Sequence, residues 1–213
     1  MSRDHILHRV RSALGRGAGQ PPAEPPPVRL RIPEVAAEAR SASFIARLEA
    51  LAGTAQVVAS RAEARDLVAS AIAGKTAVAS NSPYLEECGI TALAGVRSGF
   101  RDVDALRDAC EKADIGITSA DYALSDTGSL VMIAGPAEAR LVSLLPPAHI
   151  AVVPMDRLLT GLDELFTLLP RPADQTSSMV VITGPSRTAD IEQILVRGVH
   201  GPGRISVLLV AAY

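Results

Sequence analysis

The sequence has 213 residues, of which 48% are hydrophobic and 21% are charged, and its formal net charge at pH 7 is −2. This composition predicts one globular domain, with or without an appendage, and excludes a mainly disordered chain. Basic residues are scattered, Trp is absent and Phe and Tyr are scarce, which excludes the charged, stacking surfaces of nucleic-acid-binding proteins.

The first part of the chain differs from the rest. Apolar residues at helical spacing predict a short amphipathic helix over residues 3–14. Residues 15–33 hold six prolines and three glycines, which predicts an extended linker. We therefore expect an N-terminal helix with a Pro/Gly-rich linker over residues 1–33, and an α/β domain over residues 34–213. The helix would dock on this domain or on another chain.

Two further features bear on compartment and cofactors. No apolar run approaches the roughly 18 residues that span a bilayer, and the start, MSRDHILHRVRS, lacks an apolar signal core. We therefore expect a cytoplasmic protein with no membrane span. Cys88 and Cys110 form no CxxC motif and cannot by themselves hold an iron–sulfur cluster, so we expect two small buried residues.

Predicted strands and helices alternate through the main domain. The predicted strands are the apolar runs 54–59, 76–80, 113–120, 127–134, 149–154, 179–184 and 204–211. The predicted helices are one containing Phe44 and Leu51, then 61–73 with an S-x-x-E capping box, one opening at Pro83, 102–112, 155–169 and 189–198.

Most of these strands are apolar on both faces, which is typical of a largely parallel sheet covered by helices on two sides. We therefore predict a three-layer α/β/α fold with a mixed, mostly parallel sheet. The strands 113–120 and 127–134 are separated by too few residues for a parallel crossover, so we expect them to be antiparallel neighbours or to flank a tight turn.

Ligands of open α/β sheets bind beyond the carboxyl ends of the strands. Four predicted strand ends carry suitable residues. Ser80 and Asn81 follow the strand 76–80, and the turn Gly135–Arg140 follows the strand 127–134. The remaining candidates near strand ends are Asp126, Thr127, Gly128 and Ser129, and then Gly184, Pro185, Ser186, Arg187 and Thr188.

Two of the turns share a pattern. VMIAGPAEAR and VVITGPSRTAD each run from a strand through Gly-Pro into a predicted helix, with Arg140 or Arg187 nearby. Free N–H groups at a helix N-terminus attract anions, and a guanidinium adds a fork that fits carboxylate or phosphate. The pattern predicts a site for a small anionic group. An ordinary helix start, with Arg187 bonded to a surface acid, remains the alternative.

Acid–base candidates complete the set. His149 and His200 are the histidines of the main domain, and either can exchange protons near neutral pH. We single out His200 and Asp126 as candidate catalytic residues and His149 as a candidate ligand-binding residue, with a structural role as its alternative. No GxGxxG, HExxH or GxSxG motif is present, and no metal-ligand spacing occurs, so we expect no metal or cofactor in this chain.

Three stretches, SADYALSDTGSLVM, RLVSLLPPAHIAVV and ITGPSRTADIEQILVRGVHGP, resemble the LUD-domain family of the LutC/YkgG type, the lactate-utilisation protein C group. The resemblance covers roughly residues 34–213. It implies a sugar-isomerase/CoA-transferase-like (NagB/RpiA/CoA transferase-like) fold. It also implies participation in oxidising L-lactate to pyruvate beside two iron–sulfur partner subunits. The residues that match the family's motifs are Asp126–Ser129, Arg140, Pro146, His149, Thr183–Thr188, Asp190 and His200–Pro202.

Three functions stay open at this point. The first is a subunit of a lactate-oxidising complex that binds a small anion. The second is a stand-alone isomerase or CoA-transferase-like enzyme on a phosphorylated or acyl substrate, with Asp126 as base or nucleophile. The third is a non-catalytic metabolite-binding module.

Overall fold

The computed structural model describes residues 2–17, 19–21, 32–189 and 195–211 and divides the chain into two units, Met1–Arg31 and Ile32–Tyr213. The first unit contains helix α1, Arg3–Ala13. Its N-cap is Ser2, whose hydroxyl accepts a hydrogen bond from the backbone N–H of His5 at 3.3 Å. The predicted helix over 3–14 is thus confirmed. Most of the predicted linker lies outside the described residues.

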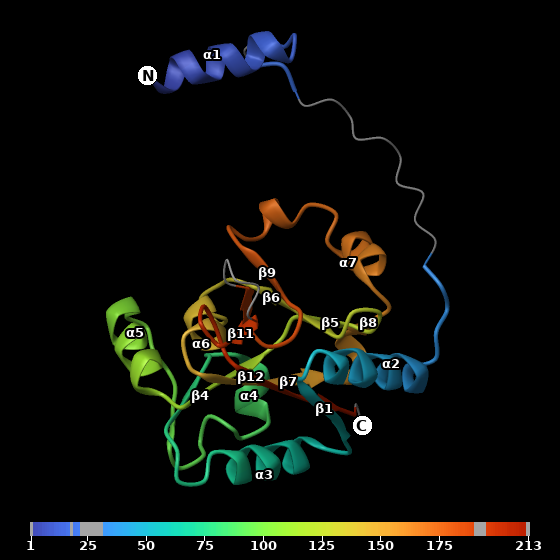
Figure 1. The fold of residues 1–213 in the computed structure, drawn as a ribbon, viewed down its shortest axis with the longest axis vertical. Helices are drawn as coiled ribbons and strands as arrows, with labels where there is room; N and C mark the ends of the chain where they lie inside the picture. Colours follow the sequence, from blue (N-terminus) through green and yellow to red (C-terminus); the bar gives the residue numbers. More distant parts are fainter. Residues whose placement is uncertain (1, 18, 22–31, 190–194, 212–213) are drawn as a thin grey trace. The chain divides into compact units, whose positions relative to one another are not determined.

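A six-stranded parallel sheet forms the centre of the second unit (Figure 1). The strand order is β1-β12-β7-β4-β2-β3, and every neighbouring pair is parallel. The strands are β1 Thr54–Val58, β2 Ala77–Ala79, β3 Val96–Arg97, β4 Ile115–Ser119, β7 Ala148–Pro154 and β12 Arg204–Val210. Nearly all side chains of β4 and β7 are buried, because helices or a second sheet cover both faces. The predicted closing strand lies inside this sheet, between β1 and β7.

Helices cover both faces of the sheet, as Figure 1 shows. Helices α3 and α4 pack on one face, in a cluster that includes Val68, Leu85 and Ile117. Helix α2 packs on the other face through Phe44 and Leu48. The helices are α2 Ala37–Ala50, α3 Arg61–Ala71, α4 Pro83–Glu87, α5 Val103–Lys112, α6 Arg140–Leu144 and α7 Leu162–Leu168.

Local capping signals predicted several helix starts. The Ser60 hydroxyl accepts from the N–H of Glu63 at 3.2 Å, and the Glu63 carboxylate accepts from the N–H of Ala59 at 2.7 Å. Asp102 caps α5 by accepting from the N–H of Ala105 at 2.8 Å. These bonds satisfy amide hydrogens that have no partner inside the helix, which is why such residues mark helix starts in sequence.

A second, four-stranded sheet has the order β8-β5-β6-β9. Its strands are β5 Tyr122–Leu124, β6 Ser129–Ile133, β8 Leu158–Leu159 and β9 Met179–Ile182. The predicted antiparallel pairing of 113–120 with 127–134 is therefore wrong, because β4 belongs to the parallel sheet and β6 to this one. The alternative, a tight turn between them, is confirmed, since Gly128 N donates to Leu124 O at 3.0 Å in the turn that joins β5 to β6. The chain changes sheets at Asp121, whose N–H donates to Val131 O at 3.0 Å and whose carboxylate accepts from Ile133 N at 2.6 Å. The mixed pairing predicted for one sheet is found in the second sheet, where β5 and β8 are parallel and the other pairs antiparallel.

One predicted helix forms only in its second half, and another is wrong. Residues 155–169 form a 3₁₀ turn over Met155–Arg157, then β8, and only then α7. The break falls at Gly161, where a Cβ would lie 2.4 Å from the Asp126 carboxylate. The segment 189–198 is not helical where it is described, because β10, Arg187–Ala189, and β11, Leu195–Arg197, form an antiparallel pair.

Candidate functional site

The topology of the parallel sheet marks one crevice for a ligand. From β2 the chain adds β3 on one side and then crosses back to add β4 on the other side of β2. Open α/β sheets bind ligands at such a switch point, outside the carboxyl ends of the strands. The residues that follow β2 and end β4 are therefore the first place to look for a site.

Serine side chains occupy this crevice. Ser80 and Ser82 follow β2, Ser119 ends β4, and all three are buried. Ser82 is the N-cap of α4 but makes no side-chain capping bond. Its hydroxyl instead lies 2.7 Å from the hydroxyl of Ser119. This bond between side chains joins the two strand ends in addition to a backbone bond, in which Ser80 N donates to Ile117 O at 2.9 Å.

A glutamate completes the cluster. Glu138, in the loop between β6 and α6, accepts through Oε1 from the hydroxyl of Ser119 at 2.7 Å and from its N–H at 3.1 Å. Glu138 is 8% exposed, and neither its Oε2 nor the hydroxyl of Ser80 has a hydrogen-bond partner among the described residues. Buried polar atoms without partners are uncommon and indicate a group kept for a ligand or a reaction.

Burial also sets the chemistry of this carboxyl group. Desolvation raises the pKa of Glu138 to about 7, while the Ser119 hydroxyl and the nearby Ser80 hydroxyl lower it and the charge of Asp121 raises it further. A carboxyl group with a pKa near neutrality can both accept and donate a proton under physiological conditions. Glu138 therefore has the properties of an acid–base group.

A polar pocket of about 330 Å³ adjoins the cluster. Ser82 belongs to both, because it lines this pocket and touches Ser119. The pocket wall is held in place by Asn81, which donates to Phe100 O at 2.7 Å and accepts from Gly99 N at 2.9 Å. The lining residues are Asn81, Ser82, Glu86, Thr91, Ser98, Gly99 and Arg101.

Sequence analysis located part of this site. It singled out Ser80 and Asn81 from their place after a strand, and both lie here. Ser82 and Glu138 lie in two of the turns that it marked as following strands, but it chose neither as a ligand-binding or catalytic residue, and it did not consider Ser119. The available signal for Glu138 was that it is the one acidic residue in the turn Gly135–Arg140.

A second group of predicted residues comes together elsewhere, against α2. The hydroxyl of Ser129 donates to Thr127 Oγ1 at 2.8 Å and lies 2.8 Å from Thr183 Oγ1. Gly128 has a φ of +68°, and a Cβ there would be 2.6 Å from Leu48 N. The turn Asp126–Ser129 and the segment that begins at Thr183 are thus neighbours.

The anion site predicted in the fourth turn is contradicted in its geometry. Arg187 begins a strand rather than a helix, and its guanidinium donates to the carbonyl of Leu51. Ser186 N donates to Pro202 O at 2.8 Å, and Ser186 O accepts from Gly198 N at 3.0 Å, so these groups are already paired. Antiparallel pairing of β10 with β11, the next strand along the chain, replaces the free helix N-terminus. Contacts from Gly184, Pro185 and Thr188 to a ligand stay predictions.

The two candidate catalytic residues lie at the surface. Asp126 is exposed beside Gly161, and His200 is exposed in the loop that follows β11. No ion pair or hydrogen bond joins them in the part of the chain that is described. Their catalytic roles stay predictions, as does ligand binding by Arg140, which begins α6 with an exposed side chain.

His149 lies in the core. It is 1% exposed, and its Nε2 lies 2.8 Å from the hydroxyl of Thr118, while Nδ1 has no described partner. Complete burial lowers the pKa of His149 to about 4, so the imidazole is neutral at pH 7. This surrounding favours the structural role over contact with a ligand.

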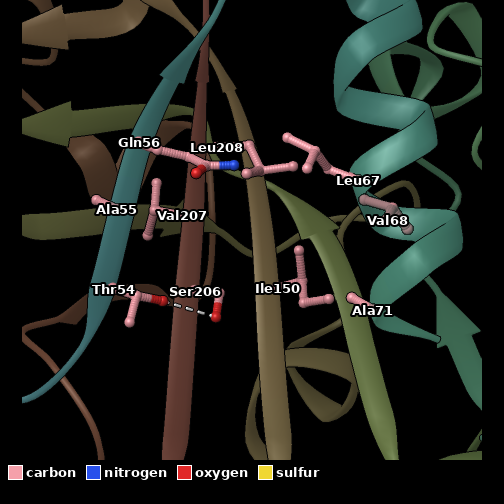
Figure 2. A pocket seen from close by; sticks show the side chains of 10 residues that line it. All are labelled: Thr54, Ala55, Gln56, Leu67, Val68, Ala71, Ile150, Ser206, Val207 and Leu208. Carbon is pink, nitrogen blue, oxygen red and sulfur yellow. Dashed lines mark hydrogen bonds between the residues drawn. The ribbon is translucent and has the colours of Figure 1, made fainter.

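An apolar hollow of about 260 Å³ lies between α3 and the sheet. Figure 2 shows Leu67 and Val68 of α3 facing Ile150 and Leu208 across it. The two hydroxyl groups that line the hollow are hydrogen-bonded to each other, with Thr54 Oγ1 2.9 Å from Ser206 Oγ. Because it lies over β1 and the middle of β12, away from the switch point between β2 and β4, we interpret it as a packing gap. Its other lining residues are Ala55, Gln56, Ala71 and Val207.

Two searches of the described residues bear on cofactors and membranes. No group of three or more His, Cys, Asp or Glu side chains there is arranged to hold a metal ion. Within the same residues, no helix has the length and apolar character needed to cross a bilayer.

Comparison with known proteins agrees with this architecture. Residues 41–210 match the model of the LUD domain. The chain is 33% identical over 156 residues to Lactate utilization protein C of Halalkalibacterium halodurans, covering 70% of this chain and 68% of that protein. It is 31% identical over 165 residues to Lactate utilization protein C of Anoxybacillus flavithermus, covering 74% of each.

One solved structure supports the fold. The crystal structure of a DUF162 family protein from Deinococcus radiodurans superposes with a TM-score of 0.64 at 20% identity, covering 83% of this chain and 99% of that one. The parallel sheet with helices on both faces and the match over residues 41–210 agree with each other. The chain is a member of the LUD-domain family.

Proposed function

We propose that this protein is a subunit of an L-lactate utilisation complex that oxidises L-lactate to pyruvate, and that it binds a small anionic ligand beside iron–sulfur partner subunits. The observation that carries the proposal is the match to the LUD domain over residues 41–210, together with relatives named Lactate utilization protein C. The polar pocket beside Glu138 is of a size suited to a small metabolite.

We assign the iron–sulfur clusters of this complex to the partner subunits, because the two cysteines of this chain are not placed to bind one. Cys88 packs in the hydrophobic core under α3 and α4, whereas Cys110 packs in a separate part of the core with α5 and α6. Burial raises the pKa of both thiols, to about 11 for Cys110, which disfavours the thiolate that binds iron.

Helix α1 is the proposed docking element for a partner. Ile6, Val10 and Leu14 lie four residues apart and are each about half exposed or more, at 50%, 49% and 64%. Arginines such as Arg9 and Arg11 flank this stripe. An amphipathic helix with an uncovered apolar stripe is suited to a groove with an acidic rim on another protein.

The experiment is a pull-down from cells of the source organism grown on L-lactate, with the tagged full-length chain as bait. We expect two iron–sulfur subunits in the eluate. The double variant Ile6→Asp/Val10→Asp should lose them. The double variant His8→Asp/Ser12→Asp, which adds the same charge on the opposite face of α1, should retain them. A chain that elutes without cluster-bearing proteins would contradict the proposal.

One observation favours a second candidate. A buried carboxyl group with a pKa of about 7 beside a pocket suits an enzyme that works alone on a phosphorylated or acyl substrate, as in the isomerase or CoA-transferase-like proteins. Turnover of a phosphosugar or an acyl-CoA by the isolated chain, lost in Glu138→Gln, would establish this candidate instead.

A further inference from the structure

We propose that the polar pocket beyond β2 and β3 binds a small hydroxycarboxylate, and that Ser82 and Ser119 relay a proton between its hydroxyl group and Glu138. This inference rests on the proposed function, because it identifies lactate as the probe. It adds a site, a direction of proton transfer and a role for three residues that neither the family match nor the relatives assign.

The direction of the hydrogen bonds defines the relay. The Ser119 hydroxyl donates its only proton to Glu138 Oε1. In the bond between the two serines, Ser82 is therefore the donor and Ser119 the acceptor. The Ser82 oxygen keeps lone pairs that can accept a hydrogen bond from a ligand in the pocket that it lines.

Proton transfer along this line leaves both serines neutral. A ligand hydroxyl gives its proton to the Ser82 oxygen, Ser82 gives its own to Ser119, and Ser119 gives its own to Glu138. Because an alcohol is a far weaker acid than Glu138, the transfer completes only while a two-electron acceptor of the proposed complex takes the hydrogen and electron pair of the adjacent C–H bond and the C–O bond becomes a carbonyl. Each of the two existing links is 2.7 Å long, a distance suited to transfer between oxygens.

The free acceptors of the cluster point the same way. Glu138 Oε2 and the Ser80 hydroxyl are nine-tenths buried or more and meet no hydrogen-bond criterion among the described residues, although the Ser80 hydroxyl lies near enough to Glu138 to lower its pKa. A folded protein loses stability by keeping such atoms unpaired, so their retention, two hydrogen bonds from the pocket in the case of Glu138, favours a use in binding or reaction. Glu138 is connected to the pocket through one unbranched line of hydroxyls.

The pocket also has a group for a carboxylate. Arg101 lines it and makes no ion pair within 4.0 Å among the described residues, and a guanidinium binds a carboxylate through two parallel hydrogen bonds. Glu86 lines the same pocket, and its carboxylate repels a ligand that carries more than one negative charge. A monoanion that also carries a hydroxyl group matches this lining.

Calorimetric titration of the full-length protein with L-lactate and with propionate, which lacks the hydroxyl group, tests the site. We expect wild type to prefer L-lactate and Arg101→Gln to bind both acids about 10-fold or more weakly, because a charge-assisted bond is lost. Ser82→Ala should bind both acids equally, since it lacks the acceptor for the hydroxyl proton. The matched control is Arg97→Gln, which removes an arginine that stacks on Phe100 outside the pocket lining.

The role of Glu138 requires a readout beyond affinity. Titrations at pH 7 in buffers of different ionisation enthalpy report protons taken up or released on binding. Both acids bring one negative charge, but only the L-lactate hydroxyl donates into the line and stabilises the Glu138 carboxylate, so wild type should release more protons, or take up fewer, with L-lactate than with propionate. Glu138→Gln should remove this difference. Unchanged affinity in Arg101→Gln, an unchanged preference in Ser82→Ala, or no heat with either acid would each overturn the proposal. Capture of the iron–sulfur partners by a chain that binds neither acid would overturn this site alone and leave the proposed function standing.

Discussion

Two regions of the molecule gather hydroxyl groups, and they differ in whether those groups are satisfied. Against α2, Ser129 joins Thr127 and Thr183, and Arg187 binds the carbonyl of Leu51. At the switch point, Glu138 Oε2 and the hydroxyl of Ser80 are left without described partners. In the first region the hydrogen bonds connect neighbouring segments of the fold. In the second region, polar atoms remain that can form hydrogen bonds with a ligand. Residue types alone did not separate them.

The largest expected effect comes from the packing that holds Glu138 in place. Helix α6 follows Glu138 and lies against Gly116, where a Cβ would be 1.9 Å from the carbonyl oxygen of Val142. We expect Gly116→Ala to lower the free energy of unfolding by about 3 kcal/mol, because β4 and α6 must separate. Denaturant unfolding measures this. Gly135→Ala, at a position with open space, is the control and should be close to neutral. A stable Gly116→Ala variant would show that α6 does not hold the site.

The buried histidine gives a pH dependence that belongs to the scaffold. The pKa of His149 is lowered from 6.5 to about 4, so the unfolded chain binds more protons between these values. The stability due to neutral His149 is present above pH 6.5 and is lost as pH falls towards 4, by about 3 kcal/mol in total. His149→Gln should remove this part of the pH profile of unfolding. Parallel profiles for wild type and variant would contradict the burial of a neutral imidazole.

Glu138 should produce the opposite slope. Its pKa is raised from 4.5 to about 7, so the folded chain binds more protons between these values and stability falls as pH rises through them. Glu138→Gln should therefore be more stable than wild type at pH 8, by roughly 2–3 kcal/mol, and close to wild type at pH 4. Thermal unfolding at both pH values measures the difference. A variant less stable than wild type at pH 8 would show that the carboxylate stabilises the fold.

The smallest expected effect sharpens the contrast between the two regions. Arg187→Ala removes a hydrogen bond to Leu51 and should lower stability by about 1 kcal/mol. Its affinity for L-lactate should stay within about twofold of wild type, whereas Arg101→Gln loses most of it. If Arg187→Ala weakened L-lactate binding as strongly as Arg101→Gln, the ligand would lie against α2, as the sequence suggested.

The sequence allowed us to predict where part of the site lies, but not which side chains contact each other there. Ser80 and Asn81 were found because parallel strands bring their carboxyl ends to one edge, a rule that needs only the strand positions. The turn that contains Glu138 was marked, but Glu138 was not chosen from it, because this turn follows a strand of the other sheet and Glu138 reaches Ser119 across a change of sheet at Asp121. No local pattern encodes that meeting.

The sequence by itself determined the amphipathic α1, the helices capped by Ser60 and Asp102, and most strands of the parallel sheet. Caps and apolar periodicity act within a few residues, so a short window contains their cause. Only the tertiary structure decided that β4 and β6 lie in different sheets, that Arg187 begins a hairpin, and that Glu138 is buried beside two serines. Those outcomes depend on which distant segments exclude water from each other, and burial, not residue type, then sets the pKa of Glu138.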